Sequence, residues 1–98
     1  RKLAEAPLDS ISLCAAGDIA LLLREPVIAK RFFELAAKAS PEWYRPQLGI
    51  GSAGMMNFDF DLALKGYAEA RARTKNEKLT RMLSGAIKEL QQILRIGL

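Results

Sequence analysis

The sequence repeats its own pattern at a spacing of thirty-four residues, and this period limits what the chain can fold into. Gly17, Gly51 and Gly85 are each thirty-four residues apart. The same spacing joins four further pairs: Pro7 and Pro41, Ala29 and Ala63, Phe33 and Tyr67, and Ala36 and Ala70. Residues separated by four and then three positions, as Ala29, Phe33 and Ala36 are, lie on one face of a helix. A period of this length indicates an array of helical hairpins, and the fold class that it predicts is all-α.

The three glycines fall inside predicted helices, where glycine is less favourable than alanine by up to about 1 kcal/mol. An unfavourable residue that recurs at one phase of a repeat needs a packing reason. We expect a neighbouring helix to approach these glycines too closely for a Cβ atom to fit.

Prolines and polar turn residues divide the chain into five predicted helices. Asp9 or Ser10 offers an N-cap oxygen to the first helix, which ends near residues 24–25. The other helices cover about residues 27–38, 44–56, 59–74 and 79–96, and residues 57–59 supply turn and cap chemistry before the fourth.

The period also predicts how the chain is organised. We expect a single domain made of a lead-in at 1–9 that continues a preceding repeat, repeats at 10–43 and 44–77, and a capping helix at 78–98. In the last helix, Arg81, Ser84 and Lys88 stand where the first helix of a repeat would bury apolar residues, which favours a cap with a polar outer side. Because the sequence does not begin with Met, we expect either a segment of a larger protein, which is the favoured alternative, or a chain with a processed start.

Composition removes much of the catalytic repertoire. The chain has one cysteine and no histidine, which excludes an internal disulfide, a zinc site built from cysteine and histidine, and a histidine proton shuttle. Cys14 lies in an apolar run and is interpreted as a packed hydrophobic residue. We therefore expect no enzyme activity, no catalytic residue, no metal and no cofactor. The longest apolar run, residues 19–23, is too short to span a membrane, and without a secretory signal the default compartment is the cytoplasm.

The repeated residues resemble the tetratricopeptide repeat, whose signature joins a Leu-Gly pair, an alanine, an aromatic residue, a second alanine and a closing proline. The residues that carry the resemblance are Gly17, Ala29, Phe33, Ala36 and Pro41 in one repeat, Gly51, Ala63, Tyr67 and Ala70 in the next, and Gly85 at the same phase of the last helix. The chain departs from the signature at its early Trp, which is Leu13 or Gln47 here, and at its second closing proline, which is Lys75.

The resemblance implies a fold and a function. The fold is an α-α superhelix, a right-handed solenoid of two hairpins with a C-terminal capping helix. The function is that of a protein-interaction module, whose concave groove binds a peptide or a helix of a partner protein. The groove residues carried over from the family are Asp18, Leu21, Leu22, Arg45, Leu48, Ser52, Met55, Met56 and Met82. The same apolar surface could instead pair two copies of the chain, so a homo-oligomer stays open.

A basic cluster supports an alternative function. Arg71, Arg73, Lys75, Lys78 and Arg81 lie in residues 61–98, which hold all of the net charge of +4. Such a cluster could bind nucleic acid or another polyanion. The structural alternative is that these cations lie near a helix C-terminus and stabilise its dipole. No aromatic residue alternates with them to stack on bases, so nucleic acid is the less favoured partner.

Overall fold

Five helices account for nearly all of the residues that the structure describes. The computed structural model describes residues 8–96, and within that range there is no strand. The helices are α1 (Leu8–Leu22), α2 (Pro26–Ala39), α3 (Tyr44–Met56), α4 (Phe60–Arg73) and α5 (Glu77–Ile96). The prediction of an all-α fold is confirmed. Pro7 and most of the expected lead-in lie outside the described residues.

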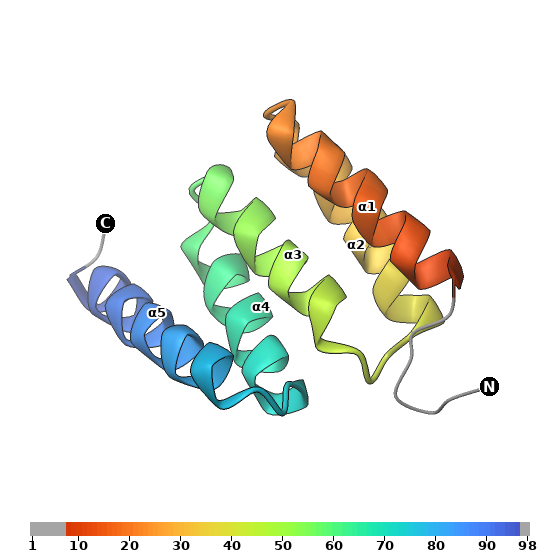
Figure 1. Ribbon diagram of the computed structural model, residues 1–98. Coiled ribbons are helices and arrows are strands. Elements are labelled where there is room, and N and C mark those ends of the chain that lie inside the picture. The colour runs from red at the N-terminus through yellow and green to blue at the C-terminus, as the bar shows by residue number, and fades with distance from the viewer. Residues whose placement is uncertain (1–7, 97–98) are drawn as a thin grey trace.

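The helices form a flat body of about 46 × 30 × 18 Å in two layers. In Figure 1, α1, α3 and α5 lie in front, and α2 and α4 lie behind them. Each helix packs on the next one along the chain, and α1 also contacts α3. By contrast, every Cα atom of α5 lies more than 8 Å from those of α3, so α5 packs on α4 alone among the described helices. None of these helices is long and apolar enough to cross a membrane.

The turns after α1 and α3 close with the same hydrogen bonds, thirty-four residues apart. After α1, the backbone N–H groups of Arg24 and Glu25 donate to the carbonyls of Leu21 and Ala20. After α3, the N–H groups of Phe58 and Asp59 donate to the carbonyls of Met55 and Gly54. Arg24 (φ 62°) and Phe58 (φ 57°) are both left-handed, at the position where a helix commonly ends with glycine.

Replacing Arg24 by glycine is expected to stabilise the chain by about 0.5–1 kcal/mol, because glycine adopts positive φ without the clash of a Cβ atom. Chemical denaturation followed by circular dichroism measures the change. The control is Arg24→Ala, which keeps the Cβ atom and should show no such gain. A loss of stability in Arg24→Gly would show that the turn does not carry the strain assigned to it.

The first residues of the helices confirm one of the two predicted N-caps and show that the other is wrong. Asp59 caps α4, since its Oδ1 accepts from the N–H of Leu62 at 3.1 Å. The prediction that Asp9 or Ser10 opens the first helix is wrong, because α1 begins at Leu8. Ser10 is fully buried instead, and its hydroxyl donates to the hydroxyl of Ser40 at 2.7 Å. This bond joins the first turn of α1 to the end of α2 and satisfies both buried hydroxyls.

The core is built around one aromatic ring and many small residues. Phe33 is fully buried, among Cys14, Ala29, Ala36, Ile50 and Ala53. A Cβ atom on Gly17 would lie 2.6 Å from the Phe33 ring, and one on Gly49 would also collide with it. The ring is therefore packed between a glycine of α1 and a glycine of α3, which holds three helices together.

Close approach explains two of the three periodic glycines and not the third. A Cβ atom on Gly51 would lie 2.6 Å from the Tyr67 ring, as the prediction required. At Gly85 it would meet nothing within 4 Å, so the packing reason does not extend to α5. The expectation is wrong there because α5 turns Gly85 toward solvent, while Leu83, Ile87 and Leu90 are buried.

The other residues that carry the repeat are mostly buried. No surface is exposed at Ala29, Phe33, Ala36, Ala63 or Ala70. Gly17 and Gly51 are also buried, while Tyr67 is half-buried and Pro41 is exposed.

Close contact between α3 and α4 depends on a further glycine. A Cβ atom on Gly66 would lie 2.5 Å from the backbone nitrogen of Gly51.

Candidate functional site

The structure places the predicted groove residues outside the core, on three helices. Leu22 of α1, Met55 of α3 and Met82 of α5 are exposed, and the other six are half-buried. The six are Asp18 and Leu21 of α1, and Arg45, Leu48, Ser52 and Met56 of α3. Packing brings α1 and α3 together, whereas the Cα atoms of α5, which carries Met82, all lie more than 8 Å from those of α3.

Two of the predicted binding residues are occupied with each other. The Nη2 atom of Arg45 donates to Oδ1 of Asp18 at 2.6 Å, in a part-buried ion pair between α3 and α1. The guanidinium carbon of Arg45 also lies 5.9 Å from the centroid of the Phe33 ring, within reach of a cation–π contact. Both contacts hold α1, α2 and α3 in place. The remaining groove residues are mainly apolar, so apolar contact dominates what this face can offer a ligand.

Cys14 interacts electrostatically with both members of this ion pair and is buried. Burial raises the pKa of the Cys14 thiol above its usual value; Asp18 acts in the same direction, and the Arg45 guanidinium opposes it. Since the thiolate is the reactive form, a buried thiol of raised pKa is a poor nucleophile at neutral pH. The interpretation of Cys14 as a packed core residue agrees with its 4% exposure.

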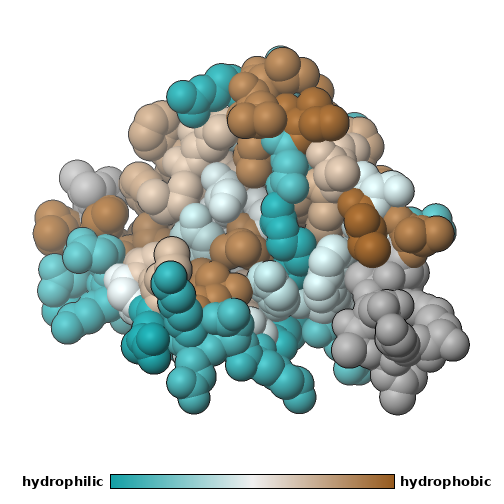
Figure 2. Space-filling view, viewed as in Figure 1, coloured by the Kyte–Doolittle hydropathy of each residue, from teal (hydrophilic) through white to brown (hydrophobic). Residues whose placement is uncertain are grey.

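The basic cluster separates into structural and exposed members. Arg73 donates to the carbonyl oxygen of Pro41 at 2.7 Å and pairs with Glu69. Arg71 donates to the Ser84 hydroxyl at 3.2 Å and so joins α4 to α5. Arg71 is itself exposed, and the other exposed members are Lys75, Lys78 and Arg81. Figure 2 shows hydrophilic side chains gathered along the lower left of the molecule in this view.

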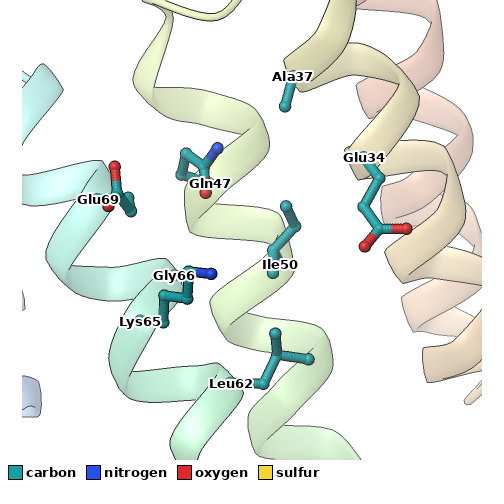
Figure 3. A pocket seen from close by; sticks show the side chains of 8 residues that line it. All are labelled: Glu34, Ala37, Gln47, Ile50, Leu62, Lys65, Gly66 and Glu69. Carbon is teal, nitrogen blue, oxygen red and sulfur yellow. The ribbon is translucent and has the colours of Figure 1, made fainter.

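A pocket of about 270 Å³ lies between α2, α3 and α4. Its lining, shown in Figure 3, is Glu34, Ala37, Gln47, Ile50, Leu62, Lys65, Gly66 and Glu69. None of the nine predicted groove residues belongs to it. On α3 the lining residues Gln47 and Ile50 lie on the opposite side of the helix from Arg45, Leu48 and Ser52, because of the 3.6-residue period.

This pocket offers little chemistry. Its volume falls just below the range of ordinary small-molecule sites, which begins near about 300 Å³. Glu69 already pairs with Arg73, and no serine, threonine or cysteine lines the pocket to act as a nucleophile. No signal in the sequence predicted it, since its residues come from three helices and share no spacing.

The site contains no arrangement typical of a metal centre. Within residues 8–96, no three side chains of the metal-ligating types come together.

Comparisons of the chain with protein-family models, curated proteins and solved structures found no match.

Proposed function

We propose that this chain is a tetratricopeptide-like protein-interaction module, in which two helical hairpins and a capping helix form a short right-handed superhelix. The recurrence of the same turn hydrogen bonds after α1 and α3 supports the repeat. So does the burial of matching alanines in α2 and α4. The proposal assigns the chain no catalysis and no cofactor, and its ligand is a segment of another protein.

The binding face in this proposal is the outward side of α1 and α3 together with Met82 of α5, the helix that does not pack on α3. The observation that carries it is that α5 stays more than 8 Å from α3, measured between Cα atoms, while Met55 on α3 and Met82 on α5 are exposed. Contiguous exposed apolar side chains mark interaction sites, and the proposal is that Met55 and Met82 contribute to one such patch. Methionine is common on surfaces that accept varied ligands, because its side chain is flexible and polarisable.

The chemistry of this face favours an amphipathic helix or a short extended peptide with apolar anchors. Asp18 and Arg45 neutralise each other, so they contribute no net charge for a ligand to match. A two-hairpin body presents a short face, and an interface near or below the standard size of about 1,600 Å² gives modest affinity. The energy of binding would come from apolar anchors near the centre of the face.

The test uses peptides selected from a random-peptide display library against the wild-type chain, with affinity measured by fluorescence anisotropy. Met55→Glu combined with Met82→Glu is expected to weaken binding at least about tenfold, the change that follows from losing about 1.4 kcal/mol. Both side chains are exposed, so the helical circular dichroism and the melting curve should stay the same.

The matched control replaces Lys75, Lys78 and Arg81 by glutamine, since Arg71 and Arg73 already make structural contacts. This variant is expected to bind the selected peptides as the wild type does. A mixed-sequence single-stranded oligonucleotide should not bind the wild type at physiological salt. Loss of peptide binding in the glutamine variant alone, or oligonucleotide binding that weakens steeply with salt, would favour the polyanion function instead.

A further inference from the structure

Helix α1 presents a second apolar surface, which extends beyond the proposed binding face and shares only Leu22 with the predicted groove residues. We call it the outer stripe: Leu8, Ile11, Ala15, Ile19 and Leu22, spaced by three or four residues along one side of the helix. Leu8 and Leu22 are 79% and 81% exposed, and Ile11 and Ile19 are 45% and 57% exposed. Figure 1 shows α1 at one end of the row of helices, with none of the other four helices beyond it.

The outer stripe is unusual for the end of a stack of helices. The opposite side of α1 is also apolar or small, since Cys14, Gly17 and Ala20 are buried there. A helix with apolar residues on two opposite sides is expected to pack on both of them, since an apolar stripe normally faces a core or a partner. The helix at the other end, α5, has a charged outer side instead of an apolar one. The side away from its buried Leu83 and Ile87 carries exposed Arg81, Lys88 and Arg95.

The architecture of the chain itself shows what normally covers this position. Ala15 stands thirty-four residues before Gly49, which packs against the Phe33 ring of α2. Ile19 stands thirty-four residues before Ala53, which is 2% exposed. The middle of the matching side of α3 is therefore packed, while Arg45 and Met56, which match Ile11 and Leu22, are half-buried. Among the described residues, the equivalent middle of α1, at Ala15 and Ile19, is exposed.

The pattern of the outer stripe is symmetric about Ala15, and this identifies its occupant. Leu8 and Leu22 lie seven residues on either side of Ala15, and Ile11 and Ile19 lie four residues on either side. We propose that two copies of the chain pair through antiparallel α1 helices, with the two-fold axis passing beside Ala15. A two-fold interface uses the same patch on both subunits, so the patch must be complementary to itself.

Size and charge both suit this pairing. The small Ala15 side chains meet at the axis and let the helices approach, while each Leu8 meets Leu22 of the second copy. Residue 9 falls opposite residue 21 and residue 18 opposite residue 12, so the carboxylates Asp9 and Asp18 do not face another carboxylate. One pair of helices about 22 Å long buries less than a standard interface, so the dimer should dissociate in the range of about 10–100 µM.

Sedimentation equilibrium of the chain over about 1 µM to 1 mM tests the pairing, a range that brackets this dissociation constant. The wild type is expected to shift from monomer to dimer, and Ile11→Glu with Ile19→Glu should stay monomeric throughout. Leu35→Glu is the control: Leu35 is 51% exposed on α2, comparable with the two isoleucines, and this variant should dimerise. A wild type that stays monomeric up to 1 mM, or a dimer that survives in the Ile11/Ile19 variant, would overturn the proposal.

A disulfide trap tests the position of the two-fold axis. Ala15→Cys is expected to form a covalent dimer on mild oxidation. Ser12→Cys is not, because two residues at position 12 lie about 9 Å apart along antiparallel helices centred on residue 15, too far for a disulfide. The wild type, whose Cys14 is buried, should give no covalent dimer. Equal yields from Ala15→Cys and Ser12→Cys, or none from Ala15→Cys, would refute this register.

Discussion

Phe33→Ala is expected to destabilise the chain by about 3–5 kcal/mol, the cost of removing a large aromatic ring from a closed core. Phe33 has no exposed surface and packs between Gly17 of α1 and Gly49 of α3. Neither glycine has a side chain that could fill the space left by the ring. Urea denaturation followed by circular dichroism measures the loss.

The matched control is Phe58→Ala. Phe58 is 80% exposed and makes only an edge contact with the Phe60 ring among aromatic neighbours, with centroids 6.4 Å apart. Its replacement should change the stability by about 0.5 kcal/mol or less. Similar small losses for both variants would mean that the Phe33 ring does not hold α1, α2 and α3 together.

Gly66→Ala is expected to destabilise the chain by about 1–3 kcal/mol, although alanine is the better helix former. The added methyl group would lie 2.5 Å from the nitrogen and 2.7 Å from the Cα atom of Gly51. These are backbone atoms, which cannot turn aside as a side chain can. The two helices would have to move apart, and thermal melting should report the loss.

Gly85→Ala is the matched control for Gly66→Ala. It makes the same chemical change in a helix, at a position where the methyl group meets nothing within 4 Å. Here the helix propensity of alanine acts alone, so this variant should be more stable by up to about 1 kcal/mol. If both substitutions shifted the melting temperature in the same direction, close approach of α3 and α4 would not explain Gly66.

The period of the sequence predicted some of this packing and missed the rest. Gly17 and Gly51 could be identified because they recur and sit opposite aromatic residues one helix further on. Gly49 and Gly66 could not, since the residues thirty-four positions away, Ala15, Leu83 and Phe32, are not glycine. Their need for glycine comes from the distance between helix axes in three dimensions. Such a distance does not produce a residue pattern that repeats every thirty-four positions.

The sequence could predict which side of each helix the residues of the candidate face lie on, but not how these sides are arranged relative to one another. Helical spacing separates Leu48 and Ser52 from Gln47 and Ile50 on α3, and the structure keeps that division. Spacing could not reveal the ion pair of Arg45 with Asp18, because the two residues are far apart in sequence and meet only after the hairpins stack. Nor could it reveal that α5 stays away from α3, which depends on how α5 packs on α4.

The roles of the basic residues also could not be predicted from the sequence. In sequence its five cations are equivalent, but only the structure shows that Arg73 bonds to Pro41 and Arg71 to Ser84. Two of the five therefore serve contacts between elements. This is why the variant that tests the polyanion function should change Lys75, Lys78 and Arg81 and leave the two arginines in place.

Photo-crosslinking through methionine tests the proposed binding face most directly. All three methionines of the chain, Met55, Met56 and Met82, belong to the predicted groove residues, so photo-methionine labels this face and no other part of the sequence. A display-selected peptide at saturating concentration is expected to form adducts at Met55 or Met82, identified by mass spectrometry. A peptide that binds fully and forms no adduct at any methionine would contradict the assignment of this face as the binding site.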